Sequence, residues 1–314
     1  MDFKVIVLGS NSAIPKIDSF SSSHLVYINS IPYLVDCCEG VQIQLNRFFP
    51  KFTNIEHIFI SHLHGDHYFG IFGLISTLNL QNRTKDLHIY ADPWLEKILS
   101  NEYSPIQISN LTYKIFFHHL KTDFELIISD KNTNVYAFAL NHKIKTWGFL
   151  FKEKEKKPNI IKDKIAEFSL SIEQIKALKN GEDIEFEGKK LPNNLFTVQT
   201  HTPRSYAYCS DTAFCQNLPN YFSDIDLLYH ETTFLDEQKE KALIVAHSTP
   251  SDAAKAAIST KSKNLLIGHF SISVANKNYF LQQTAKLFSN TILASDGLEI
   301  QIDKNHNIIK KFLT

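Results

Sequence analysis

The chain has 314 residues, of which 43% are hydrophobic and 12% aromatic, enough for one large domain or two small ones with a substantial core. Lysine plus arginine and aspartate plus glutamate each number 33, so the formal net charge is zero. This balance excludes nucleic-acid binding through whole-molecule charge, so a nucleic-acid partner would be held by a local basic patch. No run of about 18 apolar residues occurs, which predicts that no helix spans a membrane.

Cysteine usage and the first residues indicate the compartment. The four cysteines form no C-x-x-C pair and suggest no disulfide framework; they are Cys37, Cys38, Cys209 and Cys215. The opening sequence MDFKVIVLGSNS reads at once as a strand and lacks the basic segment and long apolar stretch of a secretion signal. Both observations predict a reducing cytoplasm.

Short β-type runs dominate the first third of the chain. They lie at Phe3–Leu8, His24–Ile28, Tyr33–Val35 and His57–Ile60. Apolar periodicity then predicts a helix over Phe69–Leu80 and a strand over Leu87–Tyr90. A second helix is predicted over Asp92–Ser100, because Pro93 suits a first helical turn.

Strand signals continue along the rest of the chain. They lie at Val135–Leu140, Trp147–Phe151, Tyr206–Ser210, Leu227–Tyr229, Asn264–Ile267, Thr291–Ala294 and Leu298–Ile302. Ser251–Ser259 is an alanine-rich helix behind Ser248-Thr249-Pro250, which is a helix-start signature. Interleaved strands and helices in two halves predict two packed sheets with helices outside, an α/β sandwich.

One segment departs from this alternation. Lys152–Lys157 contains four lysines and two glutamates and is predicted to protrude into solvent. Residues from about 158 to 200 read mostly as loop and helix, with an amphipathic helix over Ser171–Lys179 that ends at Asn180-Gly181. Residues 152–200 are therefore a candidate inserted arm.

The run SHLHGDH at residues 61–67 contains four strong metal ligands directly after a strand. His62, His64 and His67 offer imidazole nitrogens and Asp66 a hard carboxylate oxygen, a set that suits Zn²⁺ or a similar divalent ion. Alternate residues of an extended segment point the same way, so His62 and His64 are expected to share one ion. The following turn is expected to direct Asp66 and His67 at a second ion. A surface cluster of histidines is the less favoured interpretation.

Further candidate ligands follow three downstream strands. His142 follows Val135–Leu140, Asp211 follows Tyr206–Ser210, and His269 follows the strand that ends near Gly268. A lone histidine is more often structural than a ligand, but the repeated position at strand ends favours ligation.

Several motifs together resemble one family over nearly the whole chain. They are Leu8-Gly9-Ser10 with Ala13-Ile14-Pro15, Asp36–Leu45 (DCCEGVQIQL), Ser61–Gly70 (SHLHGDHYFG), Asn141-His142, Tyr208–Thr212 (YCSDT), His230–Phe234 (HETTF), His247–Thr249 (HST) and Gly268-His269. The chain resembles the metallo-β-lactamase superfamily and, within it, ribonuclease Z, the tRNA 3′-processing endonuclease. The H-x-H-x-D-H core marks the superfamily, whereas HETTF and HST are more specific. The resemblance implies one domain, residues 1–314, folded as a four-layered αββα sandwich with a tRNA-binding arm at 152–200.

The resemblance also implies a ligand set for two Zn²⁺ ions per chain. One ion would be held by His62, His64 and His142, and the other by Asp66, His67 and His269. Asp211 would bridge both. Such ion pairs share a water or hydroxide whose pKa is lowered toward neutrality, which would make a nucleophile available for an RNA phosphodiester.

Catalytic roles follow from the same resemblance. Asp66 would accept the proton of the attacking water or orient it, and His247 would protonate the leaving 3′-oxygen. Glu231 would hold the tautomer of His247. The alternative is that Glu231 and His247 form a buried hydrogen-bonded pair without catalytic duty. Asp36 is expected to orient the metal loop through hydrogen bonds.

Several basic residues common in ribonuclease Z are missing. The loop after Pro15 reads Lys16–Phe20 (KIDSF) rather than P-x-K-x-R-N, and Phe270–Val274 (FSISV) stands where S-R-Y is frequent. The glycine-proline tip of the arm is also absent. A modified arm is still expected to grip tRNA phosphates through a basic patch, formed by Lys152, Lys154, Lys156, Lys157, Lys162 and Lys164. The resemblance also implies a homodimer.

Three functions therefore remain open. The main hypothesis is a zinc-dependent endoribonuclease that removes the 3′ trailer of tRNA precursors. A small-molecule phosphodiesterase on the same scaffold is favoured by the missing arginines and the zero net charge. A catalytically silent RNA-binding relative is the weakest alternative, because all seven ligand positions are filled.

Overall fold

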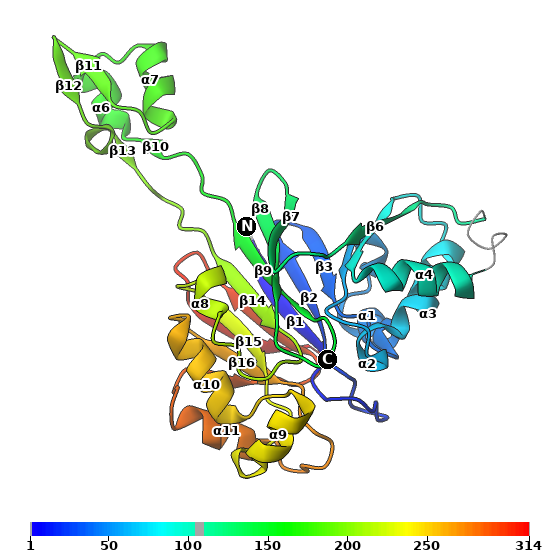
Figure 1. Cartoon of the computed structure of the whole chain (residues 1–314). Helices are drawn as coiled ribbons and strands as arrows, with labels where there is room; N and C mark the ends of the chain where they lie inside the picture. Colours follow the sequence, from blue (N-terminus) through cyan, green and yellow to red (C-terminus); the bar gives the residue numbers. More distant parts are fainter. Residues whose placement is uncertain (1, 104–109, 314) are drawn as a thin grey trace. The chain divides into compact units, whose positions relative to one another are not determined.

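The computed structural model describes residues 2–103 and 110–313. The chain forms two compact units, one from residues 1–152 with 205–314 and the other from Glu153–Arg204. Among the described residues, the larger unit contains an eight-stranded and a seven-stranded sheet. Figure 1 shows α1–α4 beside the first sheet and α8–α11 beside the second. Helices outside two packed sheets confirm the predicted αββα sandwich.

The eight-stranded sheet has the order β19-β18-β1-β2-β3-β4-β5-β6. Its strands are β1 Phe3–Gly9, β2 Ser23–Ile28, β3 Ile31–Val35, β4 His57–Phe59, β5 Leu87–Ala91, β6 Ile115–His119, β18 Leu298–Ile302 and β19 Ile308–Phe312. The helices on its side are α1 Val41–Phe48, α2 Gly65–Tyr68, α3 Gly70–Leu80 and α4 Pro93–Glu102. Neighbouring residues of a strand point to opposite faces, so Ile58 joins the core under the helices and Phe59 joins the core between the sheets.

The seven-stranded sheet has the order β17-β16-β15-β14-β9-β8-β7. Its strands are β7 Phe124–Ser129, β8 Thr133–Ala139, β9 Trp147–Glu153, β14 Ser205–Cys209, β15 Leu227–Glu231, β16 Leu265–Gly268 and β17 Thr291–Leu293. The helices on its side are α8 Leu218–Tyr221, α9 Lys239–Val245, α10 Pro250–Ser259 and α11 Asn278–Ala285. Strands β14, β15 and β16 are parallel, so their carboxyl ends meet at one edge, where the candidate ligands follow.

The smaller unit, Glu153–Arg204, has its own small core. Strand β10 (Asn159–Ile160) pairs with β13 (Thr197–Val198), and β11 (Ile184–Phe186) pairs with β12 (Lys189–Leu191). Helices α6 (Lys162–Glu167) and α7 (Ile172–Lys179) complete it, around Leu170, Leu178, Ile184 and Phe196.

One of two predictions for this segment needs correction. Residues 158–200 are mostly loop and helix, as predicted, with four short strands besides. The run Lys152–Lys157 was expected to protrude, yet Glu153 is buried, because its carboxylate accepts two hydrogen bonds from the Arg204 guanidinium at 2.8 and 2.7 Å. The predicted start of α7 is confirmed by a capping box between Ser171 and Gln174.

No described helix has the length and apolar character that a bilayer span requires.

A buried histidine lies between the two sheets. His24 of β2 is fully buried, and its Nδ1 lies 2.6 Å from the hydroxyl of Tyr206. Its ring packs edge-on against the rings of Tyr208 and Tyr229. Burial lowers the pKa of His24 to about 3, because loss of hydration disfavours the charged ring.

The burial of His24 predicts how the free energy of unfolding depends on pH. Folding lowers the pKa of His24 from about 6.5. The contribution of the neutral ring to the stability of the folded state is therefore fully present above pH 6.5 and is lost as the pH falls toward 3. Below pH 6.5, the wild-type free energy of unfolding is expected to fall by up to about 1.4 kcal/mol per pH unit through this group. Urea unfolding of metal-free protein between pH 4.5 and 7 should show a shallower slope for His24→Gln. Parallel curves would contradict the assignment.

Candidate metal centre

Asp36 anchors the loop at residues 61–67 that follows β4. Its Oδ1 accepts from the backbone N–H of Ser61 at 2.8 Å, and its Oδ2 accepts from the Ser61 hydroxyl at 3.0 Å. The same Oδ2 lies 2.8 Å from Nδ1 of His67 and 2.9 Å from the hydroxyl of Tyr208. Because Nδ1–H of His67 donates to this carboxylate, Nε2 is the ring nitrogen that faces Asp66 and Asp211.

The first group of candidate ligands combines three imidazoles with Asp211. Nε2 of His62 lies 2.9 Å from Nδ1 of His64 and 3.5 Å from Oδ2 of Asp211. Nε2 of His142 lies 3.4 Å from Nδ1 of His64, while its Nδ1–H donates to the carbonyl of Ala246 at 2.7 Å. Burial and neighbouring imidazoles lower the pKa of His62 and His64. These rings are therefore neutral and have lone pairs to offer.

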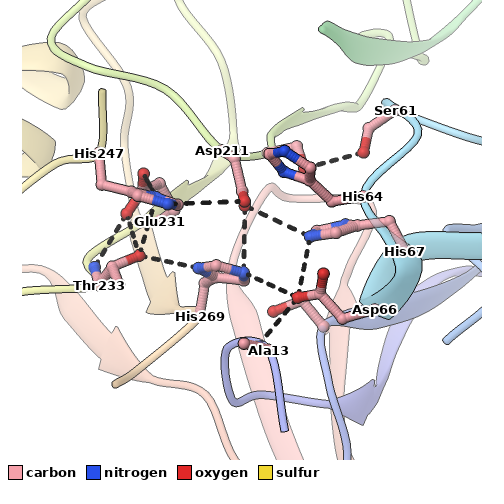
Figure 2. Close-up of polar contacts among 12 residues, drawn as sticks. Ala13, Ser61, His64, Asp66, His67, Asp211, Glu231, Thr233, His247 and His269 are labelled. Atoms are coloured by element: carbon pink, nitrogen blue, oxygen red, sulfur yellow. Dashed lines mark hydrogen bonds and ion pairs between the residues drawn. The ribbon is translucent and has the colours of Figure 1, made fainter. Parts of the chain in front are cut away.

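The second group surrounds the other oxygen of Asp211 (Figure 2). Oδ1 of Asp211 lies 3.1 Å from Nε2 of His269 and 3.5 Å from Nε2 of His67. Oδ2 of Asp66 lies 3.5 and 3.7 Å from the same two nitrogens. The three buried atoms His67 Nε2, His269 Nε2 and Asp211 Oδ1 have no hydrogen-bond partner among the described residues. Buried polar atoms are almost always partnered, so these three fit a ligand.

The spacing and charge of both groups fit divalent cations. Ligand atoms about 2.1 Å from a tetrahedral ion lie about 3.4 Å apart, close to the separations above. The carboxylates of Asp36, Asp66 and Asp211 form ion pairs only with histidines in the part of the chain described. Burial lowers the pKa of His67, but Asp211, Asp66 and Asp36 raise it well above its ordinary value. The site therefore demands positive charge, which metal ions would supply in place of protons.

The structure brings all seven sequence-predicted ligands together from four strand ends. The loop at 61–67 follows β4, and His142, Asp211 and His269 follow β8, β14 and β16. Three sets of residues have ligand atoms within 4.8 Å of one another: His62, His64, His142 with Asp211; Asp66, His67 with His269; and Asp211, His247 with His269. The first two sets together contain all seven predicted ligands.

Glu231 and His247 form a third part of the site, beside Asp211. Oε1 of Glu231 accepts from Nδ1 of His247 at 2.7 Å and from the backbone N–H groups of Thr212 and Ser248. Nε2 of His247 lies 3.9 Å from Oδ2 of Asp211. Burial lowers the pKa of His247, but Glu231 outweighs this effect and raises it to about 9. His247 therefore holds a proton at neutral pH.

Sequence reasoning missed three neighbours of this site. The hydroxyl of Tyr208 supports Asp36, the backbone N–H of Ala13 donates to Oδ2 of Asp66 at 2.9 Å, and Thr233 contacts Glu231, His247 and His269. Tyr208 and Thr233 occur inside the YCSDT and HETTF motifs, and Ala13 occurs in the opening motif. Their motif positions were visible, but their contacts depend on strands far apart in sequence.

The fold and this ligand arrangement define a hydrolase of the metallo-β-lactamase fold. The chain is 38% identical over 303 residues to ribonuclease Z of Phocaeicola vulgatus, covering 96% of this chain and 98% of the relative. It is also 38% identical over 303 residues to ribonuclease Z of Bacteroides thetaiotaomicron, with 96% of each covered. The chain belongs to the ribonuclease Z family.

Solved structures have the same fold, and a family model matches the first half of the chain. Human tRNase Z, short form, matches with a TM-score of 0.69 at 25% identity, covering 96% of this chain and 99% of the human chain. The metallo-β-lactamase fold protein YhfI of Bacillus subtilis matches with a TM-score of 0.68 at 15% identity, covering 96% and 100%. A family model described as anti-Pycsar protein Apyc1 matches residues 3–157.

Proposed function

We propose that this protein is a zinc-dependent endoribonuclease that cleaves tRNA precursors on the 3′ side. The observation that carries the proposal is the Glu231–His247 pair beside two complete ligand groups, in a chain whose relatives are ribonucleases Z. A metal centre alone suits many hydrolases, whereas a protonated imidazole beside it suits departure of a poor leaving group such as a ribose 3′-oxygen. Cleavage of a 3′-extended tRNA transcript, lost on chelation and restored by Zn²⁺, tests the proposal.

Two Zn²⁺ ions per chain are proposed for the two ligand groups. The first is assigned to His62, His64 and His142, the second to Asp66, His67 and His269, and Asp211 to both. Bound ions of this kind supply a water of lowered pKa and neutralise charge on the phosphoryl oxygens. The Asp36 carboxylate serves them indirectly by holding Nδ1–H of His67.

The acid–base roles are assigned to three side chains. Burial raises the pKa of Asp66, but the effect of His67 and His269 is larger and holds this pKa below its ordinary value. Asp66 is therefore an ionised carboxylate that orients the attacking water or accepts its proton. His247 carries the proton for the departing 3′-oxygen on Nε2, because its Nδ1–H is committed to Glu231.

A basic hollow beside His142 is the proposed contact for RNA phosphates flanking the cleaved bond. The hollow measures about 310 Å³ and includes Lys121, Lys143 and Lys145 together with one acidic residue, Asp123. All three lysines are exposed. Three cations and one carboxylate give this rim a local net positive charge, although the formal net charge of the whole chain is zero.

Replacing Lys121, Lys143 and Lys145 by glutamine is expected to weaken cleavage of precursor tRNA by raising KM. The slope of log(kcat/KM) against log salt should become shallower by about 2, since each phosphate contact contributes about 0.7–0.9. Turnover of a small chromogenic phosphodiester should stay near wild type. A matched control carries glutamine at the exposed Lys304, Lys310 and Lys311, at and before β19. Equal salt slopes in all three proteins would refute this contact.

The Glu153–Arg204 unit is proposed as a modified tRNA-binding arm, with its lysines as phosphate contacts. Excising residues 156–199 and joining the ends by a glycine-serine linker keeps the buried Glu153–Arg204 pair. The variant is expected to lose about tenfold or more of kcat/KM on precursor tRNA, because cationic contacts are removed. It should keep turnover of the small phosphodiester. Undiminished tRNA cleavage would show that the unit does not bind substrate.

The alternative is a small-molecule phosphodiesterase, which the missing arginines and zero net charge favour. Turnover of the chromogenic phosphodiester without any cleavage of precursor tRNA would support it.

A homodimer is also proposed by family resemblance and is tested by sedimentation equilibrium. A cytoplasmic location suits the tRNA substrate, and the four cysteines are free, as a reducing compartment requires.

A further inference from the structure

One hydroxyl group links the metal centre to the acid–base pair. Oγ1 of Thr233, just beyond β15, lies 2.7 Å from Oε2 of Glu231 and 2.8 Å from Nδ1 of His269. It also lies 3.2 Å from Nδ1 of His247. Figure 2 shows Thr233 between these three side chains. Thr233 is buried, with 4% of its surface exposed, so these contacts are shielded from bulk solvent.

The hydrogen positions follow from the capacity of each group. A hydroxyl donates one hydrogen bond and accepts two, and an ionised carboxylate only accepts. The Thr233 hydrogen is therefore directed at Glu231, which leaves two lone pairs for ring N–H groups. His247 donates mainly to Oε1 of Glu231 at 2.7 Å. His269 has Thr233 as the acceptor for its Nδ1–H.

The consequence is a defined tautomer for His269. With the proton on Nδ1, Nε2 carries a lone pair, and this is the nitrogen that lies 3.1 Å from Asp211 and 3.7 Å from Asp66. Nε2 has no hydrogen-bond partner among the described residues. Without the hydroxyl, the proton on His269 has no acceptor that favours Nδ1 over Nε2, and a proton on Nε2 blocks ligation.

We propose that Thr233 is a positioning residue that fixes His269 for the second metal position and couples this ligand to the Glu231–His247 pair. The inference rests on the two-metal centre proposed above. The hydroxyl orients a metal ligand and the partner of the proton donor at once, so metal affinity and proton donation change together when it is lost. Asp36 does the equivalent for His67, because its Oδ2 lies 2.8 Å from Nδ1 of that ring.

The chain offers a matched control in the preceding residue. Thr232 is fully buried, and its hydroxyl donates to the carbonyl of Gly268 at 3.2 Å. Thr232→Val therefore removes a buried hydroxyl from the same segment without touching an imidazole or the Glu231 carboxylate. Thr233→Val removes the hydroxyl at nearly constant shape, Thr233→Ser keeps it, and Thr233→Ala serves if the valine variant does not fold.

Zinc titration of metal-free protein against a chelator measures the two affinities separately. Thr233→Val is expected to weaken one of the two sites about 10–100-fold, the usual loss for a residue that orients a ligand. Thr233→Ser and Thr232→Val should bind both ions like wild type. The proposal is overturned if Thr233→Val binds both ions with wild-type affinity, or if Thr233→Ser loses affinity as strongly as Thr233→Val.

Nitrogen-15 NMR of the metal-free proteins at pH 8 gives a readout independent of zinc and of activity. Nδ1 of His269 should carry a larger share of the ring proton in wild type than in Thr233→Val, where the Asp211 carboxylate 3.1 Å from Nε2 draws the proton to that nitrogen. An unchanged tautomer overturns the proposal. If wild type binds fewer than two zinc ions, the metal count proposed above fails, while the tautomer comparison still decides the role of Thr233.

Discussion

Asp211→Ala is expected to reduce bound zinc from two ions per chain to one or none and to abolish detectable cleavage of precursor tRNA. Asp211 is the residue whose two oxygens face the two ligand groups, with Oδ2 near His62 and Oδ1 near His67 and His269. Its loss removes a ligand from each group and leaves the five imidazoles of the two groups without their shared carboxylate. Metal content after gel filtration, measured by atomic emission, is the direct test.

A near-isosteric variant separates charge from shape. Asp211→Asn keeps a carbonyl oxygen at the site but loses the charge, so it should retain more metal than alanine and less than wild type. Asp226 is a suitable control, because it is a buried carboxylate that accepts from Ser205 and Lys263 away from the metal groups. Asp226→Asn should bind two ions even if it lowers stability. Full zinc occupancy in Asp211→Ala would contradict the bridging assignment.

His247→Ala is expected to keep both zinc ions and lose about 10²–10⁴ of the turnover of precursor tRNA. His247 is assigned to neither ion; its Nε2 lies 3.9 Å from Oδ2 of Asp211, and it forms a third close set with Asp211 and His269. The loss should be much smaller on a nitrophenyl phosphodiester, because nitrophenolate departs without a proton. Unchanged turnover of precursor tRNA would show that another group donates the proton.

The pH profile gives a second measurement of the same role. The carboxylate of Glu231 overcomes the effect of burial and raises the pKa of His247 to about 9. A proton donor is present below its pKa, so turnover should fall as the pH rises through about 9. Glu231→Gln removes the main cause of the raised pKa, and the alkaline limb should therefore move to lower pH. An alkaline limb that does not move would separate Glu231 from the proton donor.

Local patterns in the sequence predicted most regular elements of the larger unit. Alternation and apolar runs identified β1 to β5, because each buries at least one face, and Pro93 and Thr249-Pro250 marked the starts of α4 and α10. The predictions omitted β6, β7 and β19, in which every residue is exposed or half-buried. They also omitted helices α1, α2, α8, α9 and α11, which begin without a side-chain cap.

Some residues of the candidate site could likewise be predicted from local sequence, and others could not. The ligands at 62–67 form a local cluster, so residue chemistry alone indicated a metal there. His142, Asp211 and His269 were plausible because each follows a strand, but their convergence requires two sheets to place four strand ends at one edge. Thr233 and Tyr208 were not predicted, since an ordinary threonine or tyrosine has no distinctive chemistry until its partners are known.

The sequence by itself determined the chemistry of this protein: which side chains are available to hold divalent ions, carry a proton and bind phosphates. Only the tertiary structure decided which ring nitrogen faces the site, which carboxylate serves both ligand groups, and that Glu153 is buried rather than exposed. The physical reason is the sequence separation over which each kind of information acts. Residue type and periodicity act over a few positions, whereas hydrogen-bond direction, burial and pKa depend on groups brought together from strands more than a hundred residues apart.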